Sequence, residues 1–154
     1  MRGWINEDTN MTDPPPLRPQ IVSLANPWLD FLTPEEAIPA ATALNNDIEA
    51  YCATYTSAEA AESTAFAALT EKRLFAFGSL PLVPDVEIDR VLEAIKQVES
   101  LPHLRGVVMG TKGLGKGLDD LAMEPIWEAL AAAELTIFVV RTFLHLGRLY
   151  NSIP

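Results

Sequence analysis

Four short apolar runs, separated by stretches with helical periodicity, constrain the fold of this chain more than any other feature. The runs lie at residues 21–25, 74–80, 104–110 and 135–140. Apolar and polar residues do not alternate along them, which indicates strands that are buried on both faces. Burial on both faces is typical of a parallel sheet that helices cover, so we expect an α/β fold.

The first helix is predicted from its start signals. Thr33 is placed to act as N-cap, Pro34 suits the first turn, and Glu36 can reach back to form a capping box. Pro39 lies inside the same span, so the helix either kinks there or begins there. An apolar stripe at helical spacing follows, and it consists of Ala41, Leu44, Ile48, Tyr51, Cys52 and Tyr55. The alanine-rich residues 58–70 show a weaker helical pattern.

Two further helices are predicted downstream. Asp85 can cap a strongly amphipathic helix, and Pro125 can open a shorter one. The acidic residues of the former lie on its outer face, where we expect a solvated surface. The apolar positions are Ile88, Val91, Leu92, Ile95 and Val98 in the first case, and Ile126, Ala129, Leu130 and Ala133 in the second. The outer acidic residues are Glu87, Asp89, Glu93 and Glu99.

Each strand except the last is followed by a helix, and right-handed crossovers then leave two architectures. One is a slice of a (β/α)8 barrel, and the other is a small doubly wound sheet. The length of 154 residues favours the doubly wound sheet, because a complete barrel takes about 250 residues.

Composition excludes several function classes. The chain has 11 Lys plus Arg against 21 Asp plus Glu, a net charge of −10, so we expect no nucleic-acid and no membrane-surface partner. No run is long enough to span a bilayer and no signal peptide is evident, which favours a cytoplasmic location. The single cysteine, Cys52, fits a reducing compartment. We expect it to pack in the core rather than to act as a nucleophile.

Two features suggest a binding site, and both have a simpler interpretation. The loop Gly110 to Gly117 follows a strand and resembles a phosphate-binding loop, with Lys116 in the position of the motif lysine. Gly117 replaces the Ser or Thr that would hold magnesium, so we expect a plain strand-to-helix loop. His103 follows Pro102 before the third strand. We expect it to be a solvated loop residue and not a metal ligand, because it has no ligand-like spacing to another histidine or cysteine.

Several sequence blocks in the same order resemble a known family. They are residues 44–47 (LNND), 78–81 (GSLP), 106–111 (GVVMGT) and 125–129 (PIWEA). Together they are similar to the aminocarboxymuconate-semialdehyde decarboxylase group of the amidohydrolase superfamily. The block 23–28 (SLANPW) most resembles fungal methylsalicylate-type decarboxylases. The resemblance covers residues 21–139.

The resemblance implies a fold and an activity. The fold is a partial (β/α)8 TIM barrel in which parallel strands alternate with helices. The activity is release of carbon dioxide from a small aromatic or unsaturated carboxylic acid with the help of zinc or another divalent metal. Barrel active sites lie at the carboxyl ends of the strands. The resemblance therefore places Asn26, Pro27, Trp28 and Thr111 at the substrate.

The metal ligands of the family are mostly missing from this sequence. No His-x-His pair occurs near the first strand, and Val140 stands where a strand-end histidine is expected. With an insertion, His145 could serve as a metal ligand, although Leu146 replaces the proline that follows it in the family. Catalytic zinc usually takes about three protein ligands, so we expect the chain as written to be truncated and inactive.

The expected organisation has three parts: a flexible leader over residues 1–19, a barrel domain over 20–140 and an atypical tail over 141–154. Half a barrel leaves strand edges and apolar surface exposed. A second hypothesis is therefore a non-catalytic protein that associates with a full-length barrel subunit or with itself. A third is a doubly wound domain that binds an anionic cofactor at the Gly110 to Gly117 loop.

Overall fold

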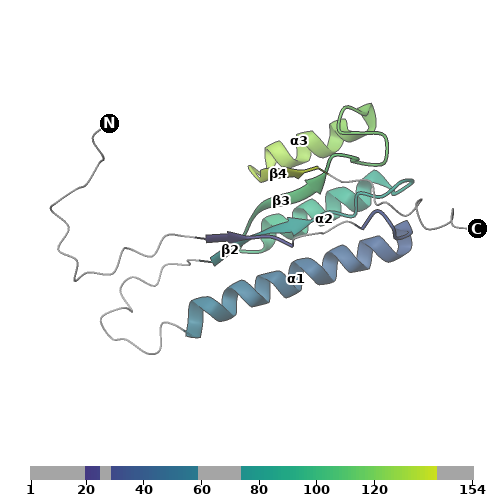
Figure 1. Ribbon diagram of the computed structural model, residues 1–154. Coiled ribbons are helices and arrows are strands. Elements are labelled where there is room, and N and C mark those ends of the chain that lie inside the picture. The colour runs from purple at the N-terminus through teal and green to yellow at the C-terminus, as the bar shows by residue number, and fades with distance from the viewer. Residues whose placement is uncertain (1–19, 25–28, 59–73, 142–154) are drawn as a thin grey trace, which may run out of the picture.

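The computed structural model describes residues 20–24, 29–58 and 74–141, and these form one parallel sheet with helices packed against it (Figure 1). The elements are β1 (Gln20–Val22), α1 (Pro34–Ala58), β2 (Leu74–Ser79), α2 (Ile88–Ser100), β3 (Leu104–Gly110), a 3-10 turn η3 (Leu121–Met123), α3 (Glu124–Ala132) and β4 (Thr136–Val140). The predicted helix over 58–70 lies outside the described residues except for Ala58.

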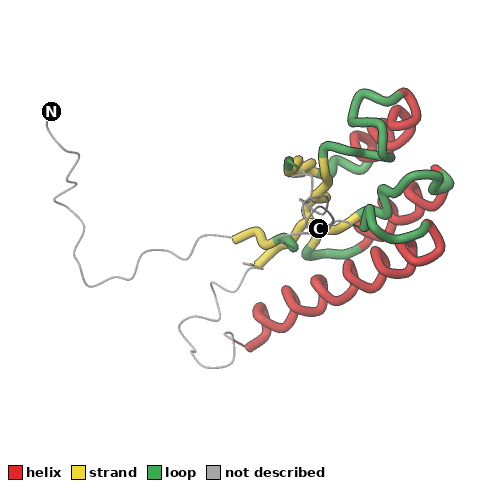
Figure 2. Tube along the Cα trace, turned by 45° about the vertical axis from the view of Figure 1, so that its right-hand side comes forward, coloured by secondary structure: helices red, strands yellow, loops and turns green. Residues whose placement is uncertain are grey.

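The sheet has the order β1-β2-β3-β4, and every neighbouring pair is parallel. The three helices lie on one side of it (Figure 2). A doubly wound sheet would carry helices on both faces and would reverse its strand order. The described residues do neither, so the fold is a curled half of a (β/α)8 barrel, as the resemblance implied.

The core lies between the sheet and the helices. Alternate residues of β2 and β3, such as Ala76, Val107 and Met109, are buried against it. Gly106 has a special role, because a Cβ there would lie 2.0 Å from the carbonyl oxygen of Thr136 and would push β4 away. The helices contribute Ala37, Ala41, Cys52, Val91, Ala94, Ile95, Val98, Ile126 and Leu130, all of them buried.

The opposite face of the sheet carries aromatic side chains. The rings of Phe77 and Phe138 stack with their centroids 5.7 Å apart, and the Arg105 guanidinium lies 4.7 Å from the centroid of Phe75. Ile21 remains 53% exposed and Phe138 46%. The expectation that every strand is buried on both faces is therefore wrong for β1 and β4. These two strands are the edges of the described sheet, and each lacks a neighbour on one side.

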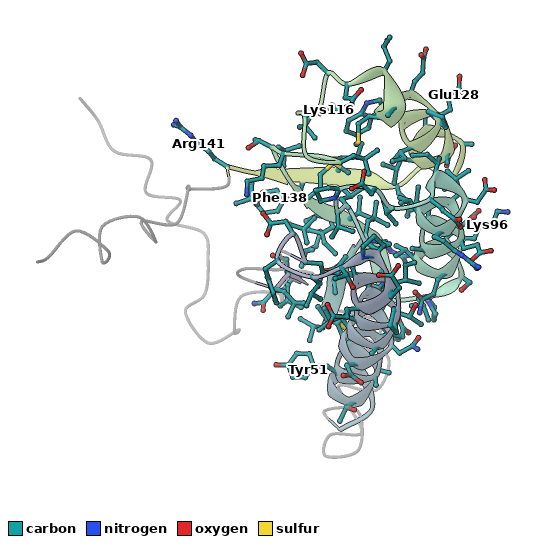
Figure 3. The ribbon with its side chains drawn as sticks, turned by 90° about the vertical axis from the view of Figure 1, so that its right-hand side faces the viewer. Tyr51, Lys96, Lys116, Glu128, Phe138 and Arg141 are labelled. Atoms are coloured by element: carbon teal, nitrogen blue, oxygen red, sulfur yellow. The ribbon has the colours of Figure 1, made fainter. Side chains whose placement is uncertain are left out.

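Helix α1 begins where its cap signals predict. The backbone N–H of Thr33 donates to Glu36 Oε2 over 3.1 Å, which is the reach-back half of a capping box. The helix runs through Pro39 without ending, so a start at Pro39 is wrong. Tyr51, a member of the predicted apolar stripe, is 49% exposed, and its ring projects sideways from α1 (Figure 3). The side chain of Tyr55 lies outside the described part.

The predicted cap of α2 is wrong. Asp85 has a φ of 62°, so it forms a turn in the left-handed region that Asp tolerates better than most residues. Glu87 occupies the N-cap position instead, and no side chain caps the helix there. The apolar stripe of α2 and its solvated acidic face are confirmed. Strand β3 has the predicted bounds.

Candidate functional site

The candidate site lies at the carboxyl ends of the parallel strands, where barrel enzymes assemble their active sites. Thr111 directly follows β3 and is exposed there. Asn26, Pro27 and Trp28, the other predicted substrate residues, lie outside the described residues, as does His145. Substrate contact by Asn26, Pro27, Trp28 and Thr111 stays a prediction, and so does metal binding by His145.

An ion pair crosses this end of the sheet. Lys112 Nζ donates to Asp30 Oδ2 over 2.6 Å. Lys112 belongs to the loop after β3, whereas Asp30 belongs to the loop after β1, and β2 lies between these two strands. The ion pair therefore joins the loops after β1 and β3 across the end of β2. We call the loops at this carboxyl end of the sheet the mouth loops. The sequence alone gives no sign of this ion pair, because 82 positions separate the partners and no local pattern links them.

The glycine-rich loop is folded on itself. The carbonyl oxygen of Lys112 accepts hydrogen bonds from the N–H groups of Gly115 and Gly117, over 2.8 and 2.9 Å. Gly113, Gly115 and Gly117 all have positive φ. A phosphate-binding loop instead directs its N–H groups toward the anion. The N–H groups of Gly113, Gly115 and Gly117 are already bonded within the loop, so the arrangement does not favour phosphate binding.

A buried amide fixes the carboxyl end of β2. Asn45 of α1 is fully buried; its Oδ1 accepts from the backbone N–H of Ser79 over 2.7 Å, and its Nδ2 donates to the carbonyl oxygen of Ser79 over 3.1 Å. Nδ2 also donates to Gln97 of α2. A Cβ on Gly78 would lie 3.0 Å from the Asn45 oxygen, so the glycine makes room for this contact. A polar residue within the apolar stripe of α1 was the signal that sequence analysis overlooked.

His103 is not a solvated loop residue, and that expectation is wrong. It is only 6% exposed. The Glu49 carboxylate of α1 accepts from the ring Nδ1 of His103 over 2.6 Å and from its backbone N–H over 2.9 Å. The carboxylate thereby satisfies two donors that the α2–β3 connection would otherwise bury unpaired. No sequence pattern indicates this pair, since 54 positions separate the two residues.

The histidine and the cysteine lie away from the candidate site. His103 directly precedes β3, so its pair with Glu49 is at the amino end of the sheet. Cys52 is fully buried, which confirms its expected place in the core. Burial, and secondly the charge of Glu49, raise the pKa of the Cys52 thiol. A thiol held in its protonated form is a poor nucleophile.

The described residues do not fit a metal centre. Among them no group of three or more His, Cys, Asp or Glu side chains is gathered so that it could hold an ion. Val140 ends β4 beside Gly110, and valine offers no ligand atom. The part of the chain that the structure describes also contains no helix that is long and apolar enough to cross a membrane.

No protein-family model and no curated protein matches the chain. Among solved structures, it is similar to the crystal structure of Metarhizium anisopliae IDCase in apo form, with 40% sequence identity and a TM-score of 0.66. The match covers 80% of this chain and 28% of that one, so this chain spans little more than a quarter of its neighbour's length. The similarity supports the amidohydrolase superfamily and a decarboxylase-like fold.

Proposed function

We propose that this chain carries a partial barrel of a metal-dependent, cytoplasmic decarboxylase that acts on a small aromatic or unsaturated carboxylic acid. Within the amidohydrolase superfamily, the aminocarboxymuconate-semialdehyde decarboxylase group and its methylsalicylate-type members fit the sequence blocks best. The observation that supports this proposal is the 40% identity with IDCase over 80% of this chain. That identity accompanies a half-barrel with the strand order that such an enzyme requires.

The chemistry sets what such a site must do. Decarboxylation breaks a carbon–carbon bond, leaves the electron pair on the substrate carbon, and requires a proton to replace the departing carbon dioxide. The substrate must be held by its carboxylate and its ring while this happens. In this chain the proposal assigns that role to the mouth loops, with Asn26, Pro27, Trp28 and Thr111 as the substrate residues.

The metal part of the reaction is not assigned to the described residues, because they offer no ligand set. His145 is the one ligand candidate from the sequence. A single histidine cannot hold catalytic zinc, which usually takes about three protein ligands. We therefore expect the 154-residue chain to be inactive by itself.

Turnover by the purified chain tests the inactivity. The chain is incubated with zinc and a series of salicylate-type acids, and released carbon dioxide is measured. We expect no release above a protein-free control. Zinc-dependent release by the chain alone would overturn the claim that it is inactive.

The decarboxylase assignment needs a separate test. The transcript is sequenced on both sides of the present reading frame, and the protein that it encodes is assayed with the same acids. A His-x-His pair upstream and a Phe-x-His-Pro phrase at β4, together with zinc-dependent carbon dioxide release, would support the assignment. A protein that contains these ligands but releases no carbon dioxide from any acid in the series would contradict it.

A second candidate function is a non-catalytic partner that associates with a full-length barrel subunit or with another copy of itself. The exposed apolar side chains of β4 favour it, since Ile137, Phe138 and Val139 are 38%, 46% and 45% exposed. These side chains alternate between the two faces of an edge strand, and an exposed strand edge with apolar side chains is a common site of association with another chain. Size-exclusion chromatography with light scattering tests it, and a well-behaved monomer that does not bind a full-length barrel protein would argue against it.

A further inference from the structure

We propose that Lys112 binds the carboxylate group of an aromatic carboxylic acid at the mouth of the barrel, and that Asp30 pairs with this lysine when no acid is bound. The inference deepens the proposed function, on which its substrate class rests. What carries it is the ion pair that joins Lys112 and Asp30 across the carboxyl end of β2.

The position of Lys112 suits such a role. It is the second residue after β3 and follows Thr111, a predicted substrate residue. Its carbonyl oxygen accepts from Gly115 and Gly117, so the backbone that carries the lysine is held in place. A fixed backbone lowers the entropy that is lost when the side chain binds an anion.

Of the two partners, the lysine side chain is the more exposed to solvent. The Lys112 side chain is 46% exposed, whereas that of Asp30 is 27% exposed. The ammonium group therefore keeps contact with solvent beside its partner, and a lysine has three N–H donors for more than one oxygen. A second carboxylate could approach it without moving the loop.

The exchange is also reasonable energetically. Ion pairs at partly exposed positions contribute little to stability, because water and salt screen them. An incoming acid that adds ring contacts to its own carboxylate can therefore compete with Asp30. A lysine that served only to tie two loops together would gain nothing from an added acid.

The two interpretations predict different changes in the affinity for the acid when either residue is replaced. If Asp30 competes with the acid, then Asp30→Asn strengthens acid binding and Lys112→Met weakens it. If the pair only ties two loops together, both substitutions loosen the same loops and neither strengthens binding. Lys116 provides a matched control, because it is an exposed lysine of the same loop (Figure 3).

The experiment titrates the ¹⁵N-labelled 154-residue chain with salicylate and follows the amide shifts of Asp30 and of the Gly110 to Gly117 loop. We expect Asp30→Asn to bind salicylate about three- to fivefold more tightly, and Lys112→Met at least about threefold more weakly, than the unmodified chain. Lys116→Met should bind like the unmodified chain. Salicylamide, which lacks the carboxylate, should shift none of these amides.

Equal affinity of the Lys112→Met and Lys116→Met variants would overturn the proposal. So would unchanged affinity in Asp30→Asn, an equal response to salicylamide, or the absence of any shift in the unmodified chain and in Asp30→Asn. Circular dichroism of each variant checks that it is folded. Failure here is distinct from failure of the decarboxylase assignment, since binding is read from amide shifts and the assignment from carbon dioxide release.

Discussion

The two ends of the α1–sheet contact are held by chemically different polar groups that lie one helical turn apart. Toward the carboxyl ends of the strands, Asn45 pairs with both backbone groups of Ser79. Toward the amino ends, Glu49 pairs with the ring and the backbone N–H of His103. The candidate-site end therefore depends on a neutral amide, and the opposite end depends on an acid and a histidine.

The difference indicates which end is built to keep its shape. Asn45 binds the main chain at β2, so its contact depends neither on the side chain at position 79 nor on the charge of either partner. Glu49 instead needs the imidazole of one particular residue. The strand end that borders the candidate site is therefore held by a contact that involves no charged group.

The largest expected effect is at Asn45. Asn45→Leu keeps the volume but leaves the buried N–H and C=O of Ser79 unpaired, so we expect a loss of about 2–4 kcal/mol in the free energy of unfolding. Urea denaturation measures it. Asn46→Leu is the control, because Asn46 is exposed and loses only a surface hydrogen bond from Gln97. Equal losses of unfolding free energy in both variants would mean that the buried Asn45–Ser79 contact stabilises the fold no more than an exposed asparagine does.

A smaller effect is expected at Glu49. Glu49→Gln removes the charge and keeps an acceptor oxygen for only one of the two His103 donors, so we expect a loss of about 1 kcal/mol. Glu49→Ala leaves both donors of His103 unpaired, and it should cost more, about 1–3 kcal/mol. Denaturation curves of the two variants, recorded beside those of Asn45→Leu, rank the two ends of the contact. A loss at Glu49→Ala above that of Asn45→Leu would reverse the ranking.

Cys52, in the turn after Glu49, gives an effect that appears only at high pH. Burial and the Glu49 charge raise the pKa of its thiol in the folded chain. Between the thiol pKa of the unfolded chain, about 8.5, and the higher folded value, the folded state binds more protons. The free energy of unfolding should therefore fall as pH rises through this range. Urea denaturation at successive pH values should show a shallower fall in Cys52→Ala than in the unmodified chain.

The smallest effect on stability is expected at the mouth of the barrel. Asp30→Asn breaks an ion pair whose partners are both partly exposed, so we expect a change of no more than about 1 kcal/mol. Thermal unfolding at low and high salt measures it. A loss as large as that of Asn45→Leu would show that the loops depend on this pair, and would favour the loop-tying interpretation over acid binding.

Elements that depend on local pattern were predictable from the sequence. The bounds of β3, the stripe of α2 and the start of α1 follow from runs, periodicity and a cap, all of which act over a few residues. Asp85 failed as a cap because a turn with positive φ intervenes before α2. Tyr51 failed because residues that share a helical stripe do not all reach the sheet.

The polar contacts needed the tertiary structure. Lys112 and Asp30 are 82 positions apart, His103 and Glu49 54, and Asn45 and Ser79 34. His103 was misjudged for this reason, because a loop histidine is exposed unless a distant carboxylate meets it. Of the candidate site, the sequence predicted the place of Thr111 at a strand end. The place of Asp30 beside Lys112 became evident only from the tertiary structure.

The sequence by itself determined the alternation of strand and helix and hence the parallel sheet, because hydrophobic periodicity is a local property. Only the tertiary structure decided between a half-barrel and a doubly wound sheet. The two folds share the same alternation of strand and helix and differ in whether the helices cover one face of the sheet or both faces. It also decided which polar groups pair, because burial brings distant residues together and leaves no water to satisfy them.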